Sequence, residues 1–527
     1  MGPPAASPVG AQEGKPQASA ADELQALLDE ASRVFAAYVR RNQEPQAAVV
    51  SGKRAGELQH DLELDLFPEQ GLGQRGIWGD VRAVCDAATN TWSGRFLYKL
   101  YAAPTPIGVV GEALTALLNN NSHVFCASPA GILIEARVAA KLAALAGFPE
   151  QAGGLTFPGG SYSNIHALMT ARNQRFPAVK RQGLCALAGV RPVVFASQHA
   201  HYSIDKAAMA AGIGLDGVIH VPADEGGRMD AAELRRMVQA AIAEGQTPFF
   251  VCATMGTTVL GACDPLADIA AVCEEFGVWL HVDGSWGGPL GLFAESPATA
   301  PTFAVPRGRI DSMTINPHKL LGVPLQCSFL LVRSGLDTMR QALGLGASYL
   351  FHADDADAPQ SGQPAGSCLD VGDATLGCGR RPDALKFWLM WRYYGTQYFV
   401  RRVAHARRAA LRLAEMVQAR SSAAGRWELV AKPPGTCVCF WFVPGRLAAH
   451  PHRAESWGLA TRRICRHING AGSALIDYAT VDLPRRGASC PLPAFFRIPL
   501  NSPDVSEYTL TAVLDAIERA AIELYSH

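Results

Sequence analysis

Residues 312–322 read Ser312-Met-Thr-Ile-Asn-Pro-His-Lys-Leu-Leu-Gly322, and Lys319 directly follows His318. Upstream lies a run of strand-forming residues, Val278-Trp-Leu-His-Val-Asp-Gly-Ser-Trp286, which leads into Asp283. A lysine after one strand and an acid at the end of another are the two groups that a pyridoxal phosphate site needs. The lysine forms a Schiff base with pyridoxal phosphate (PLP), and the acid keeps the pyridine nitrogen protonated. These residues therefore predict amino-acid chemistry at Cα.

Short apolar runs alternate with helical patterns around these two stretches. The runs are residues 193–195, 217–221, 249–252, 278–282 and 329–332, and helical patterns at 231–243 and 265–276 separate several of them. Continuous apolar strands interleaved with helices indicate an α/β fold with a mostly parallel sheet covered on both faces. Ligands on such sheets bind at loops near the strand ends.

The chain of 527 residues is long enough for several domains. Residues 1–20, rich in Pro, Ala, Gly and Gln, are expected to be a disordered tail, and apolar residues recur at helical spacing from Asp22 to Val39. We predict an N-terminal helical segment at 21–118, a large α/β domain at 119–391 and a smaller C-terminal α+β domain at 392–527. A long helix is expected at about 395–420.

Charge and cysteine content exclude several classes of function. Lys plus Arg and Asp plus Glu both number 47, so nothing favours a nucleic-acid or membrane partner. No apolar run approaches a membrane span, and no secretory signal is evident. The 13 cysteines are scattered without zinc-site spacing, which predicts reduced thiols, a cytoplasmic location and no metal.

Further candidate residues follow in the order that a PLP site requires. The turn Phe157-Pro-Gly-Gly-Ser-Tyr-Ser-Asn164 precedes a helical run, and helix-start N–H groups bind phosphate. The alternative is an ordinary glycine-serine turn capping a helix. His201 could stack on a cofactor ring or be structural, and Thr258 follows a strand as a second contact. The predicted phosphate turn comprises Gly160, Ser161, Tyr162 and Ser163.

Several motifs together resemble the PLP-dependent group II decarboxylases, in the glutamate and cysteine-sulfinate decarboxylase branch. They are Asn316-Pro-His-Lys319, Pro324-Leu-Gln-Cys327, Ser348-Tyr-Leu-Phe351, Gly372-Asp373, Cys378-Gly-Arg380 and Lys386-Phe-Trp-Leu-Met-Trp391. The resemblance runs from about residue 94 to the C-terminus. It implies the aspartate-aminotransferase-like fold (type I) and an obligate homodimer with active sites at the interface, to which the segment 21–118 would contribute.

The resemblance also implies roles for individual residues. Lys319 would be the Schiff-base lysine, Asp283 the pyridinium partner and His201 the stacking histidine. The remaining assignments are cofactor contacts by Thr258 and His318, phosphate contacts by Ser161 and Ser163, and a grip on the substrate α-carboxylate by Arg497, whose planar fork suits that task.

The chain departs from the family pattern in two segments. Where glutamate decarboxylases have Gln and Ser facing the substrate, this chain has Lys99 and Tyr101, which favours a small acidic side chain; alternatively, Lys99 points to solvent. The predicted lid, residues 352–367, has no aromatic residue, so the proton donor to Cα would be His352, a water or Lys319.

The expected function is α-decarboxylation of a small acidic L-amino acid, namely aspartate or cysteine sulfinate, with glutamate as a third candidate. Two alternatives stay open. One is decarboxylation of an aromatic or unusual amino acid in a specialised pathway, and the other is a non-catalytic homologue that keeps the PLP fold.

Overall fold

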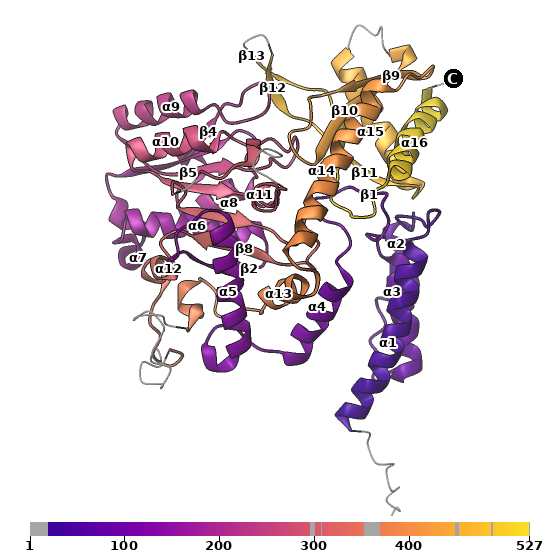
Figure 1. Cartoon of the computed structure of the whole chain (residues 1–527), viewed down its shortest axis with the longest axis horizontal. Helices are drawn as coiled ribbons and strands as arrows, with labels where there is room; N and C mark the ends of the chain where they lie inside the picture. The colour runs from indigo at the N-terminus through magenta and orange to yellow at the C-terminus, as the bar shows by residue number, and fades with distance from the viewer. Residues whose placement is uncertain are drawn as a thin grey trace, which may run out of the picture. The chain divides into compact units, whose positions relative to one another are not determined.

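The computed structural model describes residues 19–295, 301–306, 308–351, 369–447, 453–485 and 488–525. The chain divides into two compact units, Met1–Ser93 and Gly94–His527 (Figure 1). Of the predicted tail, residues 1–18 lie outside the described residues, and so does the whole predicted lid at 352–367. Within the described ranges, no helix is both long enough and apolar enough to cross a membrane.

The first unit is helical, with α1 (Ala20–Asn42), α2 (Ala55–Asp61) and α3 (Gly73–Ala87). Ser19 caps α1, because its hydroxyl accepts a hydrogen bond from the Asp22 N–H at 3.2 Å. The predicted helix from Asp22 is confirmed and begins two residues earlier. An ion pair of 2.7 Å between Arg82 and Glu30 joins α3 to α1.

The second unit contains a sheet of seven strands in its described residues, in the order β2-β8-β7-β6-β5-β3-β4. Their bounds are β2 (Gly153–Phe157), β3 (Arg191–Ser197), β4 (Val218–Val221), β5 (Gln246–Thr254), β6 (Trp279–Asp283), β7 (Ser312–Ile315) and β8 (Ser328–Val332). Strand β8 runs antiparallel to both neighbours, and the other pairs are parallel. The predicted mostly parallel sheet is confirmed. Strand β2 was not predicted, because Gly153-Gly-Leu-Thr-Phe157 is short and begins with two glycines.

Helices cover both faces of this sheet, as the alternating strand residues require. Val194 and Ala196 of β3 face a core that includes α6, α8 and α12, and Val193 and Phe195 face a core that includes α5, α9, α10 and α13. These helices are α5 (Pro129–Leu145), α6 (Gly160–Arg175), α8 (Ser203–Ala210), α9 (Ala231–Ala243), α10 (Leu266–Phe276), α12 (Leu336–Leu343) and α13 (Ala384–Tyr394). Shorter helices α7 (Val179–Gln182) and α11 (Gly288–Leu292) lie in the connections.

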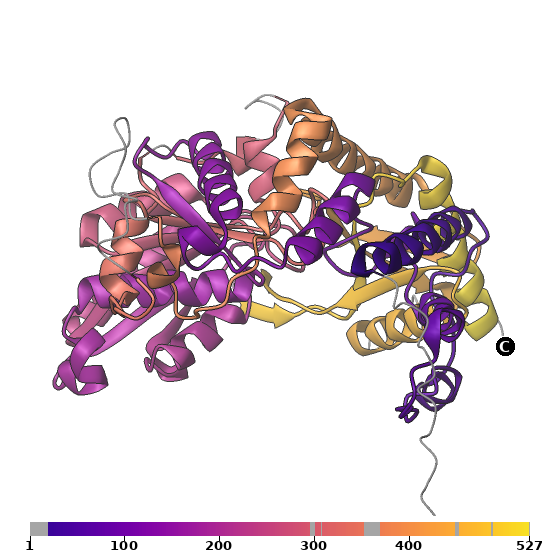
Figure 2. The ribbon, with the colours of Figure 1, turned by 90° about the horizontal axis from the view of Figure 1, so that it is seen from below.

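A smaller sheet of the second unit has the order β1-β11-β14-β10-β9. Its strands are β1 (Phe96–Leu97), β9 (Gly425–Leu429), β10 (Cys437–Pro444), β11 (Leu475–Ala479) and β14 (Phe495–Pro499). Three helices pack against it, namely α14 (Thr396–Ala419), α15 (Arg453–Gly470) and α16 (Glu507–Tyr525). Helix α14 confirms the long helix predicted at about 395–420. Figure 2 shows the hairpin β12 (Asp482–Arg485) and β13 (Ala488–Pro491) reaching from this sheet toward the large one.

The short strand β1 changes where the N-terminal segment ends. Phe96 and Leu97 pair in parallel with Leu475 and Ile476 of β11, so they complete the edge of the small sheet. Helix α4 (Pro106–Leu118) then packs against α13. The predicted segment 21–118 is therefore divided in the structure, and residues 94–118 belong to the larger unit.

Candidate active site

A polar cavity of about 250 Å³ lies where β5, β6 and β7 end and α6 begins. The parallel register places Thr254 beside Asp283 and Asp283 beside Thr314, so the three strands end at one edge of the sheet. Ligands bind at such edges in α/β folds. Seven of the predicted site residues line the cavity: Gly160, Ser161, His201, Thr258, Asp283, His318 and Lys319.

Asp283 is buried at the end of β6 and accepts two hydrogen bonds. Asn164 Nδ2 donates to Oδ2 at 2.9 Å, and the Ser285 N–H donates to Oδ1 at 3.0 Å. Burial opposes ionisation, but the charge of Lys319 and these two bonds together keep the pKa of Asp283 below its usual value. An ionised carboxylate at this position can hold a protonated ring nitrogen.

Asn164 is the residue that orients Asp283, and the sequence did not reveal this role. Its Oδ1 accepts from Thr314 Oγ1 at 2.9 Å and lies 3.1 Å from His281 Nε2. Its Nδ2 also donates to Ser203 Oγ at 2.9 Å. Burial lowers the pKa of His281 to about 4, so this ring stays neutral at physiological pH. The contacts at Oδ1 fix the amide with its NH₂ group toward Asp283.

Lys319 lies in a turn after β7, where its backbone N–H donates to the Asn316 carbonyl at 3.0 Å. Burial lowers the pKa of Lys319; Asp283 opposes that shift, and the charge of Arg497 adds to it. In the described part of the chain, Lys319 forms no ion pair or side-chain hydrogen bond. An amine with a lowered pKa and no internal partner suits covalent attachment to a carbonyl.

Two histidines lie beside Lys319 with neutral rings. Burial lowers the pKa of His201, and its Nδ1 accepts a hydrogen bond from the Ser203 N–H at 3.3 Å. Burial, with a further contribution from Lys319, lowers the pKa of His318 to about 4. The His318 ring is anchored through Nδ1, which lies 2.6 Å from the backbone oxygen of Cys327. Neutral imidazoles can stack on or contact a cofactor without adding positive charge.

The predicted phosphate turn is only partly directed into the cavity. Gly159 has φ +102°, and α6 starts at Gly160 without a side-chain cap, so its first N–H groups are left for an anion. A Cβ at Gly160 would lie 2.7 Å from Ser285 Oγ and from Asn316 Nδ2, so a larger residue would require these two side chains to move. Ser161 lines the cavity, whereas Tyr162 is exposed outside it and the Ser163 hydroxyl lies 2.8 Å from Ser328 Oγ.

None of the three predicted substrate residues lines this cavity, and Arg497 contacts one residue that does. Arg497 on β14 donates through Nη1 to the Thr258 carbonyl at 2.8 Å, and Thr258 lines the cavity. Lys99 is half-exposed, and its Nζ lies 3.0 Å from Asp477 Oδ2. The Tyr101 ring packs 5.3 Å from the Phe96 ring.

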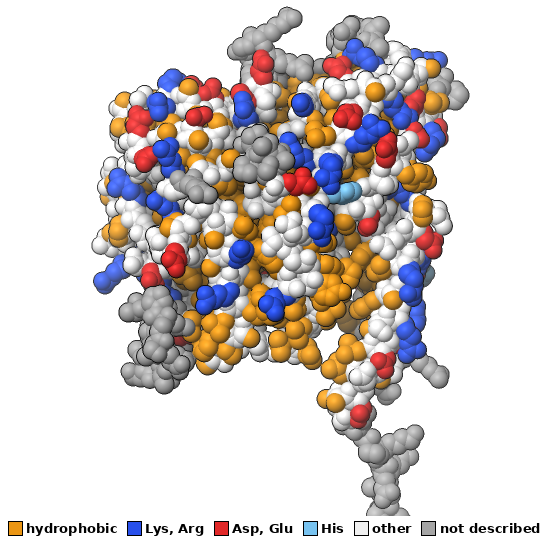
Figure 3. Space-filling model, viewed as in Figure 1, with side chains coloured by type: hydrophobic (Ala, Val, Ile, Leu, Met, Phe, Trp, Pro, Cys, Tyr) orange, Lys and Arg blue, Asp and Glu red, His pale blue; other side chains and the backbone are white. Residues whose placement is uncertain are grey.

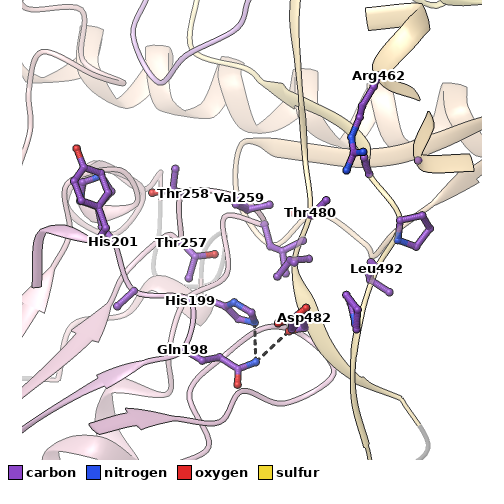
Figure 4. Close-up of a pocket in the computed structure, with 18 of the residues that line it drawn as sticks. Gln198, His199, His201, Thr257, Thr258, Val259, Arg462, Thr480, Asp482 and Leu492 are labelled. Atoms are coloured by element: carbon purple, nitrogen blue, oxygen red, sulfur yellow. Dashed lines mark hydrogen bonds between the residues drawn. The ribbon is translucent and has the colours of Figure 1, made fainter. Parts of the chain in front are cut away.

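A wider cavity of about 810 Å³ adjoins the first and shares His201, Tyr202 and Thr258 with it. Figure 4 shows Gln198 and His199 on one wall, and Arg462 and Leu492 on the other. Gln198 Nε2 donates to the backbone oxygen of Asp482 at 3.1 Å, which ties the β12–β13 hairpin to the turn after β3. The wider cavity therefore adjoins the cavity that Lys319 lines.

The residues around the small cavity fit PLP. The uncapped start of α6 suits the phosphate, and the ionised carboxylate of Asp283 suits the ring nitrogen. Lys319, which has no internal partner among the described residues, suits the aldehyde, and the neutral His201 suits the ring. Three lining residues, Thr254, Trp286 and Asn316, also carry buried polar atoms without a partner in the described chain, namely Oγ1, Nε1 and Oδ1. A polar ligand would supply such partners.

Seven other lining residues were not among the predicted site residues: Asn164, Tyr202, Thr254, Gly256, Ser285, Trp286 and Asn316. Three of them stand within three positions of Asp283 or Lys319, so closeness to a strand end was the available signal. Asn164 carried a weaker signal, as the last residue of the phosphate-turn motif.

Comparison with known proteins identifies relatives along most of the chain. A family model described as the pyridoxal-dependent decarboxylase conserved domain matches residues 57–443. L-Aspartate decarboxylase dtxS4 of Metarhizium robertsii is 40% identical over 393 residues, which cover 74% of each chain. Human cysteine sulfinic acid decarboxylase is 40% identical over 399 residues, covering 76% of this chain and 77% of the relative.

The same similarity holds in three dimensions. The crystal structure of mouse CSAD superimposes with a TM-score of 0.84 and 33% sequence identity, covering 95% of this chain and 99% of that one. This match extends over the elements that enclose the cavity.

Proposed function

Because this chain belongs to the pyridoxal-dependent decarboxylase family, we propose that it removes the α-carboxylate of a small acidic L-amino acid. Aspartate and cysteine sulfinate are the proposed substrates, and glutamate is a poorer one on the expectation that Tyr101, bulkier than the Ser of glutamate decarboxylases, shortens the substrate pocket. Relatives named as L-aspartate and cysteine sulfinic acid decarboxylases support this substrate class. The chain is a PLP-dependent amino-acid decarboxylase.

The observation that carries the substrate proposal is a pair of cations beside the cavity. Arg497 Nη2 and Lys99 Nζ contact the same carboxylate oxygen of Asp477, at 2.9 and 3.0 Å. Two cations that already hold one carboxylate can hold the carboxylates of an acidic amino acid. We assign the α-carboxylate to Arg497 and the distal acidic group to Lys99.

Bound PLP supplies an electron sink for the pair released when the bond between Cα and the carboxylate breaks. Lys319 would hold the cofactor aldehyde, and Asp283 would hold the ring nitrogen with its proton. The start of α6 and Ser161 would hold the phosphate, while His201 and His318 would position the ring. Burial lowers the pKa of Lys319, so its amine gives up a proton more readily than an exposed lysine does, which suits proton exchange near Cα.

The proposal includes a homodimer in the cytoplasm. Apolar side chains gather along the lower edge of the face in Figure 3, over α4 and α13. On α4, the exposed residues include Val109, Val110, Leu117 and Leu118. A contiguous apolar surface of this kind supports burial against a second copy. The described cysteines are free and mostly buried, which supports a reducing compartment.

The test measures CO₂ release from aspartate, cysteine sulfinate, glutamate and tyrosine, with Lys319→Ala as the inactive control. Lys99→Ala should raise KM for the acidic substrate roughly three- to tenfold, since Lys99 is half-exposed and its charge is partly screened. Lys180→Ala, on α7 and outside both cavities, is the matched control and should leave KM unchanged. Release from tyrosine but not from aspartate would reject the acidic substrate class. Absence of release from all four would favour a non-catalytic homologue.

A further inference from the structure

Asp477 holds the two cations that the proposed function assigns to the substrate. Its Oδ2 accepts from Arg497 Nη2 at 2.9 Å and from Lys99 Nζ at 3.0 Å, so the two cationic nitrogens lie at most about 6 Å apart. Its Oδ1 accepts from the Tyr478 N–H at 3.0 Å. Both oxygens are therefore engaged, and the carboxylate is held in one orientation.

This arrangement follows from the strand register. Asp477 on β11 is directly paired with Arg497 on the adjacent antiparallel strand β14. Arg497 is nearly buried, with 5% of its side chain exposed, and Asp477 is 16% exposed. A buried guanidinium needs a counter-ion, and Asp477 supplies it.

The donors of Arg497 show what an incoming carboxylate would meet. A guanidinium grips a carboxylate with two neighbouring donors, and each of its two forks includes Nη2. Both Nη2 hydrogens are already used, by the Tyr98 carbonyl at 2.8 Å and by Asp477. Nε, in contrast, is buried and has no partner among the described residues.

Of the two groups on Nη2, only Asp477 can leave without moving the backbone. The Tyr98 carbonyl belongs to the main chain directly after β1, and the neighbouring Lys99 carbonyl accepts from Asn501 Nδ2 at 3.3 Å. The Asp477 carboxylate needs only a side-chain rotation to release Arg497. A bidentate ligand of Arg497 would therefore take the place of Asp477 on Nη2 and use Nε or Nη1 as the second donor.

We propose that Asp477 is a specificity-determining residue: a resident carboxylate that occupies Arg497 and Lys99 and competes with the carboxylates of the substrate. The inference rests on the proposed function, because it takes Arg497 and Lys99 as the carboxylate ligands. Every substrate must displace Asp477 from Arg497. A substrate with a second acidic group also replaces it on Lys99, whereas a substrate with a neutral side chain leaves Asp477 on Lys99.

The experiment measures binding of succinate, a dicarboxylate without an amine, to the PLP-loaded protein by isothermal titration calorimetry. Asp477→Asn removes the competing charge and keeps the size of the side chain, so the Kd for succinate should fall roughly tenfold. Asp482→Asn makes the same charge change in the exposed wall of the wider cavity, without contact to Arg497, and should leave this Kd within twofold of wild type.

Asp477→Ser is the second variant, and it should show the same direction of change. A Kd for succinate that rises or stays within twofold in the Asp477 variants would overturn the proposal, because Asp477 would then hold Arg497 in place and not compete for it. If neither variant folds with PLP bound, Asp477 is structural and the proposal also fails. The binding readout is independent of turnover. A wild-type protein that releases no CO₂ from acidic amino acids, yet shows the tenfold change, would refute the proposed function alone.

Discussion

Replacing Asn164 by Ala tests whether the buried amide network controls the ionisation of Asp283. The side chain of Asn164 donates to Asp283 and Ser203 and accepts from Thr314, all at 2.9 Å. A hydrogen bond to a charged group contributes about 1.5–3 kcal/mol and a neutral one about 1 kcal/mol. Thr314 Oγ1 already lies 3.4 Å from His281 Nε2, so these two groups can pair when the amide is removed.

The expected loss is therefore about 3 kcal/mol in the free energy of unfolding, measured on the PLP-free protein by urea titration at pH 7.5. PLP should also bind about tenfold more weakly, because Asp283 loses a donor that favours its ionised form. Absorbance titration near ~420 nm, where lysine-bound PLP absorbs, follows that affinity.

Asn120→Ala is the matched control, since among the described residues the Asn120 amide donates only to the nearby Leu118 carbonyl at the end of α4. Its effect on stability should stay within about 0.5 kcal/mol. Equal stability and equal PLP affinity in the Asn164 and Asn120 variants would refute the argument that Asn164 keeps Asp283 ionised.

Three further predictions follow from individual contacts. Ser161→Ala should weaken PLP binding in absorbance titrations, whereas Ser163→Ala should cost about 1 kcal/mol of stability and leave PLP affinity unchanged, because its hydroxyl faces Ser328. Burial lowers the pKa of His166 to about 4. Stability should therefore fall as the pH drops from about 6.5 toward 4, because in that range the unfolded chain binds a proton at His166 and the folded chain does not. His166→Gln should flatten that part of a plot of thermal stability against pH. Arg380→Met should cost about 3–5 kcal/mol in urea unfolding, since it leaves the buried Glu135 carboxylate without the guanidinium that now lies 2.6 Å away; a loss below about 1 kcal/mol would show that this ion pair does not stabilise the fold.

The architecture could be predicted because buried parallel strands leave a plain signal in the sequence. β3 to β6 are continuous apolar runs, and the polar residue that ends β6 marks the carboxyl edge where the site lies. The edge strand β1 left no such signal. It has only two residues, Phe96 and Leu97, and its strand character comes from pairing with a segment nearly 380 residues away. The boundary of the N-terminal segment was therefore predicted at 118, and the structure divides the chain at 93.

Side-chain direction limited the prediction of the site. The motif at 157–164 predicted a phosphate turn before a helix, and α6 does begin at Gly160, but the motif could not separate Ser161 from Ser163. Two residues along a helix change the facing direction by about 200°. Ser161 thus lines the cavity while Ser163 packs on Ser328, and Asn164, which looked like the end of the motif, reaches Asp283.

Lys99 illustrates the same limit for charge. The sequence allowed two interpretations of Lys99: a cation that faces the substrate, or a lysine that points to solvent. Neither interpretation includes Asp477, which is 378 residues away along the chain and contacts Lys99 in the structure. Asp477 engages Lys99 and Arg497 together. Preference for an acidic substrate therefore depends on how much more tightly the two cations bind the substrate than they bind the Asp477 carboxylate. An acid that reaches only one of the cations gains less from that exchange than one that spans both. Because the two nitrogens lie at most about 6 Å apart, one acid with two carboxylates can contact both cations at once.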